Sequence, residues 1–178
     1  MKLHVGCGSK VLEGYTNIDK YVDGPNIEKF DILKLPYADY SIDEILAEHL
    51  VEHLTFAEEK IFFEEMYRLL KTNGLLHIEV PDFEWVVKAF LDAKDQFNDF
   101  YQVGAIDHYF GNGLGCDNRW GLLTTAIWGN QNGSGQFHKN GYTKKKFESI
   151  ARIIGFSSVE ISESFNKGTQ VLIAKFKK

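Results

Sequence analysis

Short apolar runs alternate with longer amphipathic segments along much of the chain, a pattern typical of alternating strands and helices. Strands are predicted at residues 2–5, 15–18, 26–30, 43–47, 75–80, 158–162 and 169–176. Helices are predicted at residues 55–71, 84–93 and 143–154. The first helix has the best-defined start, because Thr55 and Glu58 have the spacing of a capping box. The alternation predicts an α/β fold with a mostly parallel sheet.

The chain of 178 residues is predicted to form a single domain, residues 1–178, with an unusual segment at about 96–140. Nine of the sixteen glycines lie between Gly104 and Gly141, and aromatic residues such as Trp120 and Trp128 are interleaved with them. This composition indicates a long irregular insertion with aromatic anchors. A substrate lid is the favoured interpretation, and a dimer surface or an elaborated core are the alternatives.

The most informative local feature is a tight glycine turn, Gly6-Cys7-Gly8, directly after the first predicted strand. Asp19 ends the second predicted strand, and Asp31 and Glu48 follow two later ones. Because parallel strands have their carboxyl ends at one edge of the sheet, we expect these residues to converge there. Glycines allow the backbone to approach a ligand closely, and a carboxylate accepts hydrogen bonds from ribose hydroxyls. The sequence therefore predicts a nucleoside site at this edge.

Several segments of the chain occur in the order found in a known family. They are Val5-Gly6-Cys7-Gly8, Asn17-Ile18-Asp19, Phe30-Asp31-Ile32-Leu33, Glu48-His49-Leu50-Val51-Glu52-His53-Leu54 and Arg68-Leu69-Leu70-Lys71-Thr72-Asn73-Gly74. In this order they resemble the class I S-adenosylmethionine-dependent methyltransferases. The resemblance implies a Rossmann-like, three-layer αβα fold with a seven-stranded mixed sheet or a trimmed version of it, an antiparallel C-terminal strand and a shortened N-terminus. It also implies methyl transfer from S-adenosylmethionine to a small acceptor, such as a sugar or another metabolite.

The same resemblance implies a role for each residue at the predicted edge. Gly6 and Gly8 would border the methionine part and the ribose, with Cys7 part of the same cofactor-binding turn. Apart from the resemblance, Cys7 is expected to be a small packing residue rather than a nucleophile. Asp19 would bind the ribose hydroxyls. Asp31 and Ile32 would meet the adenine, and Glu48 and His49 would lie beside the methionine and sulfonium end. An acidic edge suits this cofactor electrostatically, because it carries a sulfonium and an ammonium group.

Methyl transfer to an oxygen acceptor usually needs a base, for which histidine is the obvious candidate. His138 is favoured because it lies in the irregular segment that leads back to the core, and His108 is second. His49 and His53 are further candidates.

Three other functions remain open at this point. Residues 49–53 match H-x-x-E-H, in which His49 and His53 could bind zinc if the segment were an α-helix. However, this segment follows a predicted strand, and no clear third acidic ligand lies downstream, so no metal is predicted. A nicotinamide oxidoreductase is disfavoured because the glycine turn lacks a third glycine. A domain that binds the cofactor without catalysis is the remaining alternative.

Charge and composition restrict the partners. A net charge of −5 argues against nucleic acid, and no apolar stretch is long enough to span a membrane. The two cysteines, Cys7 and Cys116, fit no disulfide framework, so a cytoplasmic location is expected.

Residues 9–16, between the first two strands, are too few for a crossover helix. One face of the sheet is therefore expected to be poorly covered, and a homodimer is one way to cover it.

Overall fold

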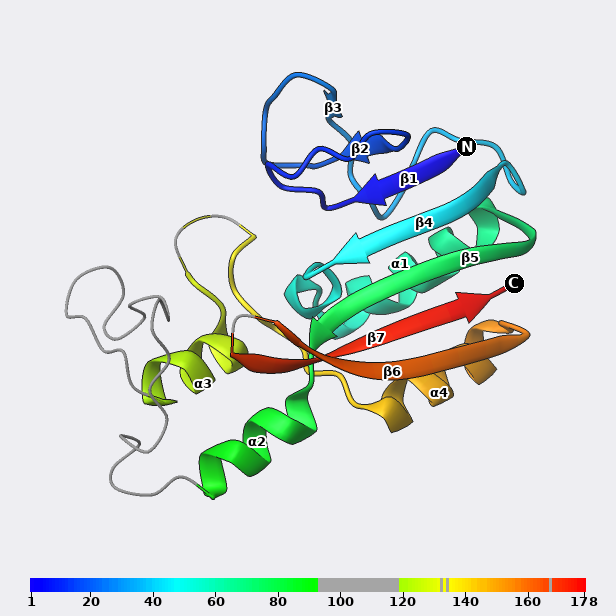
Figure 1. Ribbon diagram of the computed structural model, residues 1–178. Helices are drawn as coiled ribbons and strands as arrows, with labels where there is room; N and C mark the ends of the chain where they lie inside the picture. Colours follow the sequence, from blue (N-terminus) through cyan, green and yellow to red (C-terminus); the bar gives the residue numbers. More distant parts are fainter. Residues whose placement is uncertain (93–118, 132, 134, 167) are drawn as a thin grey trace.

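Seven strands form one mixed sheet in the computed structural model, which describes residues 1–92, 119–131, 133, 135–166 and 168–178 (Figure 1). The strand order is β3-β2-β1-β4-β5-β7-β6. The strands are β1 (Lys2–Val5), β2 (Thr16–Ile18), β3 (Ile27–Glu28), β4 (Ile42–Glu48), β5 (Leu70–Pro81), β6 (Ser158–Asn166) and β7 (Thr169–Lys177). The first five are parallel, and β7 is antiparallel to both β5 and β6. The predicted mostly parallel sheet with an antiparallel C-terminal end is confirmed.

The helices begin and end close to where their sequence signals lie. They are the 3₁₀ helix η1 (Val51–His53), α1 (Phe56–Leu69), α2 (Phe83–Leu91), α3 (Arg119–Trp128) and α4 (Lys144–Ile154). Helix α1 has the predicted capping box between Thr55 and Glu58, and α4 ends at Gly155 in the left-handed conformation. Helix α1 stops at Leu69, two residues before the predicted end, because Leu70 is already extended and begins β5.

Helix α3 corrects the prediction that residues 96–140 are irregular throughout. Its sequence contains a glycine and two adjacent threonines, which weaken the helical signal. The helix packs against α2, where Val86, Ala89 and Leu123 form a small second core. Tertiary packing therefore supplies what the local sequence lacks. The rest of the insertion up to residue 118 lies outside the described residues.

Helices α1 and α4 cover one face of the sheet, where they lie behind the strands in Figure 1. The side chains between these helices and the sheet form the main apolar core. From the strands it includes Leu3, Val5, Ile18, Ile45, Ala47, Leu76, Ile78, Leu172, Ala174 and Phe176. From the helices it includes Phe62, Phe63, Met66, Leu69, Phe147 and Ala151. This packing fixes the parallel strands relative to one another, and with them the edge at which they end.

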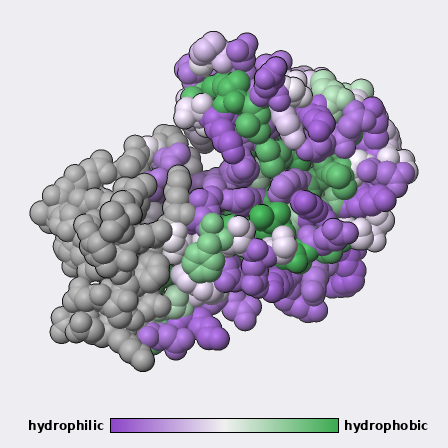
Figure 2. Space-filling model, viewed as in Figure 1, coloured by the Kyte–Doolittle hydropathy of each residue, from purple (hydrophilic) through white to green (hydrophobic). Residues whose placement is uncertain are grey.

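The opposite face of the sheet differs from the three-layer arrangement implied by the family resemblance. Figure 1 shows no described helix in front of β1, β4 and β5. This face carries polar side chains: Lys2 and Glu44 form an ion pair of 2.7 Å, and His77 is in register with Lys175. Figure 2, in the same view, shows hydrophilic residues over much of the front with apolar patches between them. The connections between β1, β2, β3 and β4 contain no helix, so the described part of the sheet has two layers here.

Side-chain hydrogen bonds hold these short connections in place of helices. Between β1 and β2, the buried amide of Asn17 donates to the carbonyls of Leu12 and Tyr15 and accepts from the backbone N–H of Leu12. Between β3 and β4, Arg68 of α1 donates to the carbonyls of Leu35 and Tyr37. Asn17 and Arg68 thus each hold one of these short connections in place.

Candidate active site

The glycine turn after β1 has the backbone conformation that glycine favours, with φ of +63° at Gly6 and +55° at Gly8. The two glycines have different surroundings. A Cβ at Gly6 would lie 2.4 Å from Cδ1 of Leu50, whereas a Cβ at Gly8 would meet nothing within 4 Å. Gly6 is therefore needed for packing against the turn that follows β4. Gly8 faces open space, as close approach of a ligand requires.

Cys7 lies between these glycines and is buried. Burial raises the pKa of its thiol to about 11, so the sulfur is protonated at neutral pH. These features support its predicted role as a packing residue.

Asp19, at the end of β2, is bound to the glycine turn. One carboxylate oxygen, Oδ2, accepts from the backbone N–H of Gly8 at 2.8 Å. The other, Oδ1, accepts from the N–H groups of Tyr21 and Val22 at 2.7 and 2.9 Å. Asp19 therefore ties the ends of β1 and β2 together and has hydrogen-bonding capacity left mainly at Oδ2.

Glu48, at the end of β4, reaches the same turn from the other side. Its carboxylate binds the ammonium group of Lys10 and lies 3.6 Å from Nε2 of His4. Since β4 and β2 flank β1, the carboxylates of Asp19 and Glu48 both contact the segment between Gly8 and Lys10. The structure thus brings together two acidic residues that the sequence predicted would converge.

Asp31 and Ile32 are placed differently from each other. Asp31 pairs with Lys20 at 2.7 Å, and this hydrogen bond lowers the pKa of its carboxyl group. Because Lys20 follows Asp19, Asp31 lies near the end of β2. Ile32 is buried in the main core, so most of its side chain packs there rather than at the edge.

His49 follows β4 directly and lies between two carboxylates. Its Nδ1 is 3.3 Å from Oε1 of Glu52, and its Nε2 is 3.3 Å from Oε1 of Glu79. His49 has a φ of +49°, which ends β4 and turns the chain into η1. The segment is therefore not the α-helix that the zinc-protease reading of residues 49–53 requires.

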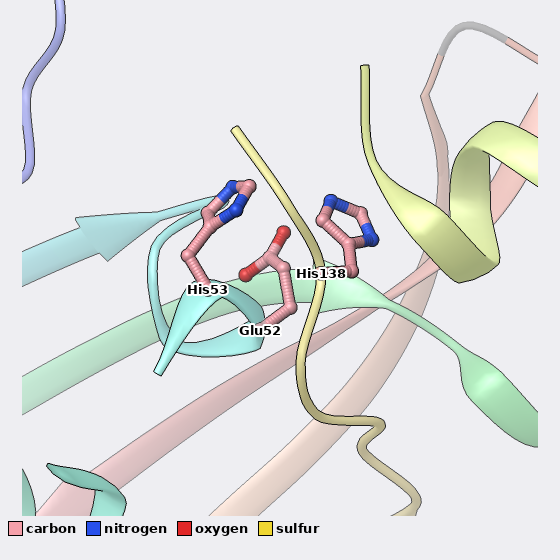
Figure 3. A group of neighbouring side chains, drawn as sticks. All are labelled: Glu52, His53 and His138. Carbon is pink, nitrogen blue, oxygen red and sulfur yellow. The ribbon is translucent and has the colours of Figure 1, made fainter. Parts of the chain in front are cut away.

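His138 is brought to the same place by the segment that follows α3. Figure 3 shows the carboxylate of Glu52 between the imidazoles of His53 and His138, whose ring centroids are 4.7 Å apart. Burial lowers the pKa of His138, so its imidazole is neutral at pH 7. Burial also acts to raise the pKa of Glu52, but His49, His53 and His138 together hold it below its ordinary value. His108, the second predicted base, lies outside the described residues.

The segment that carries His138 also reaches the end of β2. A Cβ at Gly135 would lie 2.8 Å from Cε2 of Tyr21, and Phe137 accepts a hydrogen bond from Nδ1 of His53. The described part of the insertion therefore bridges the segments that follow β2 and β4. Sequence reasoning missed Lys10, Lys20 and Glu79 here, because charged residues carry no periodic signal. The sequence showed Glu52 and His53 as part of one short motif, but it did not show that His138 lies beside them.

The fold is shared with solved methyltransferase structures. A SAM-dependent methyltransferase from Archaeoglobus fulgidus superposes with a TM-score of 0.60 at 16% identity, covering 99% of this chain and 85% of that one. One from Methanosarcina mazei gives 0.61 at 13% identity, covering 99% and 91%. This is the class I methyltransferase fold. Residues 10–78 also match the family model described as a methyltransferase domain.

A third methyltransferase structure contains ligands. It is the 1,6-didemethyltoxoflavin-N1-methyltransferase of Burkholderia thailandensis with bound 1,6-didemethyltoxoflavin and S-adenosylhomocysteine. It superposes with a TM-score of 0.61 at 14% identity, covering 99% of this chain and 70% of that one. The predicted resemblance to the class I methyltransferases is confirmed by the fold and by the family model.

No curated protein matches the sequence. Among the described residues, no helix is long and apolar enough to cross a membrane.

Proposed function

We propose that this chain transfers a methyl group from S-adenosylmethionine to a small-molecule acceptor at the carboxyl edge of β1, β2 and β4. The observation that carries the proposal is the convergence of Asp19 and Glu48 on the glycine turn. Gly8 leaves open space at that turn. Fold and family model support the reaction class.

The charges of the site suit this cofactor. S-adenosylmethionine carries a sulfonium and an ammonium group, and Glu48 already holds an ammonium group, that of Lys10. A cationic ligand can therefore take the place of a lysine side chain without any carboxylate being left unpaired. In this proposal Asp19 offers Oδ2 to the ribose, Asp31 lies toward the adenine, and His49 lies beside the methionine end.

His138 is the proposed base for an acceptor that must lose a proton. Its Nδ1 contacts the carbonyl of Ala126 at 2.9 Å, and a carbonyl oxygen can only accept a hydrogen bond. The hydrogen is therefore on Nδ1, and Nε2 has the lone pair that can accept a proton. A small acceptor is proposed because the net charge of −5 disfavours nucleic acid. A cytoplasmic location is proposed because the two cysteines fit no disulfide framework.

Calorimetric titration with S-adenosylmethionine tests the cofactor site. Asp19→Asn and Glu48→Gln should each weaken binding at least tenfold, which corresponds to about 1.4 kcal/mol. Asp43→Asn is the matched control, because Asp43 is near the opposite end of β4 and pairs with Lys71. Equal affinity in all three variants and the unmodified chain would contradict the assignment. Mass analysis of candidate acceptors incubated with the cofactor then tests methyl transfer itself.

A further inference from the structure

Glu52 is the most unusual charged residue among those described. It is 2% exposed, and neither of its carboxylate oxygens has a hydrogen-bond partner in the described part of the chain. A buried carboxylate normally accepts several hydrogen bonds, because loss of hydration is costly. The backbone around Glu52 is in contrast well bonded, since its carbonyl accepts from the N–H groups of Lys139 and Asn140. The side chain is thus held firmly in place without a hydrogen bond to either oxygen, although Nδ1 of His49 lies 3.3 Å from Oε1 as an ion-pair partner.

Two imidazoles are oriented toward this carboxylate. One ligand atom from each of Glu52, His53 and His138 lies within 4.8 Å of the other two. Nδ1 of His53 contacts the carbonyl of Phe137 at 3.1 Å, as Nδ1 of His138 contacts that of Ala126. Each Nδ1 therefore bears the hydrogen and each Nε2 bears a lone pair. Histidines that bind metals are typically fixed in this way, by donation from the other ring nitrogen to a carbonyl.

We propose that Glu52, His53 and His138 form a binding site for one divalent transition-metal ion. Two imidazoles and one carboxylate are a ligand set used by zinc and by other first-row metals. The bonds of such an ion are about 2.0–2.2 Å long, so the side chains must close slightly from their present separation. An ion would add a positive charge beside Glu52, which is otherwise 3.3 Å from Nδ1 of His49.

This site differs from the one that the H-x-x-E-H spacing suggested. There, His49 and His53 would be the ligands on one face of an α-helix. Here, Glu52 is itself a ligand, and the third ligand, His138, comes from a distant part of the chain. Three protein ligands leave coordination positions open, so the ion can bind an oxygen atom of a second molecule. Nε2 of His138 cannot bind an ion and accept a proton at once, so a bound ion replaces its role as a base.

Metal titration of the full chain tests the site without reference to methyl transfer. The protein is stripped with a chelator and titrated with Zn²⁺, Mn²⁺ and Mg²⁺, and its Co²⁺ form is examined by absorption spectroscopy. We expect one Zn²⁺ per chain and weak binding of Mg²⁺, which prefers oxygen ligands. Glu52→Gln and His138→Gln should each weaken Zn²⁺ binding at least about 100-fold, beyond the effect typical of groups that only orient ligands. His77→Gln is the control, because His77 lies on the polar face of β5.

The outcomes separate the proposal from its alternatives. Loss of binding in both cluster variants but not in His77→Gln supports the site. No stoichiometric uptake of Zn²⁺, Co²⁺ or Mn²⁺ by the unmodified chain overturns it, as does equal affinity in all variants. Anomalous diffraction at the zinc edge from crystals of the unmodified chain gives an answer even if a variant fails to fold. A peak away from the three residues would also overturn the proposal, and neither result bears on cofactor binding at Asp19.

Discussion

Asp19 and Glu52 are both buried carboxylates near the carboxyl edge of the sheet, but the chain treats them in opposite ways. Asp19 accepts three backbone hydrogen bonds, whereas Glu52 accepts none among the described residues. The first is satisfied by its own chain and organises the glycine turn. The second is surrounded by imidazoles without being satisfied by them. The comparison indicates that Asp19 stabilises the fold through its own hydrogen bonds, whereas Glu52 has room for the metal ion proposed above.

The largest effect is expected at Gly6. Gly6→Ala forces a Cβ into Leu50 and places alanine at a φ of +63°. We expect a loss of about 2–4 kcal/mol in the free energy of unfolding, from overpacking and the left-handed backbone together. Gly8→Ala shares only the backbone strain and should lose about 1–2 kcal/mol. Urea unfolding of both variants measures the difference, and equal losses would show that Leu50 does not restrict Gly6.

Removing the carboxylates of Asp19 and Glu52 in turn should have different effects on stability. Asp19→Ala leaves the N–H groups of Gly8, Tyr21 and Val22 without their acceptor, so it should destabilise the chain by about 2 kcal/mol. In metal-free protein, Glu52→Gln removes a buried carboxylate that accepts no hydrogen bond but forms an ion pair with His49. It should therefore cost less stability than Asp19→Ala.

Thermal and urea unfolding under metal-free conditions measure both variants. The contrast between the two carboxylates fails if Glu52→Gln is as destabilising as Asp19→Ala. Added Zn²⁺ should then stabilise the unmodified chain but not Glu52→Gln.

A third, smaller effect is expected where a side chain replaces a crossover helix. Arg68 makes a bidentate contact with the buried Glu65, and its guanidinium also donates to two carbonyls of the connection before β4. Arg68→Ala leaves Glu65 partly unpaired and should lower stability by about 1–2 kcal/mol. Arg68→Lys keeps the charge but not the bidentate geometry, so it should recover only part of the loss. Full recovery in urea unfolding would indicate that charge alone holds the connection.

The smallest effect is expected at Lys10, which is exposed and pairs with Glu48. Lys10→Met should change stability little, because exposed ion pairs contribute little. If Glu48 binds the cationic cofactor, this variant should bind S-adenosylmethionine more tightly than S-adenosylhomocysteine, which lacks the sulfonium charge, by a further factor of about two to three. Calorimetry with both ligands at low and high salt measures the ratio. If the ratio of the two affinities depends on neither the variant nor the salt, Glu48 does not interact with the sulfonium.

The sequence by itself determined the elements and the order of the acidic residues along them. Thr55 with Glu58, the glycine turn at Gly6 and Gly8, and Asp19 after β2 are local signals, because capping, left-handed backbone and strand ends depend on neighbouring residues. The family resemblance added the sheet topology.

The tertiary structure alone decided three features. Helix α3 forms where the local pattern is weak, because it packs on α2. Asn17 holds a connection that the sequence showed only as too short for a helix, and Arg68 holds the connection before β4. His138 lies beside Glu52 because the segment after α3 folds back across the end of β4. These contacts join residues distant in the chain, and such contacts leave no periodic or short-range pattern in a single sequence.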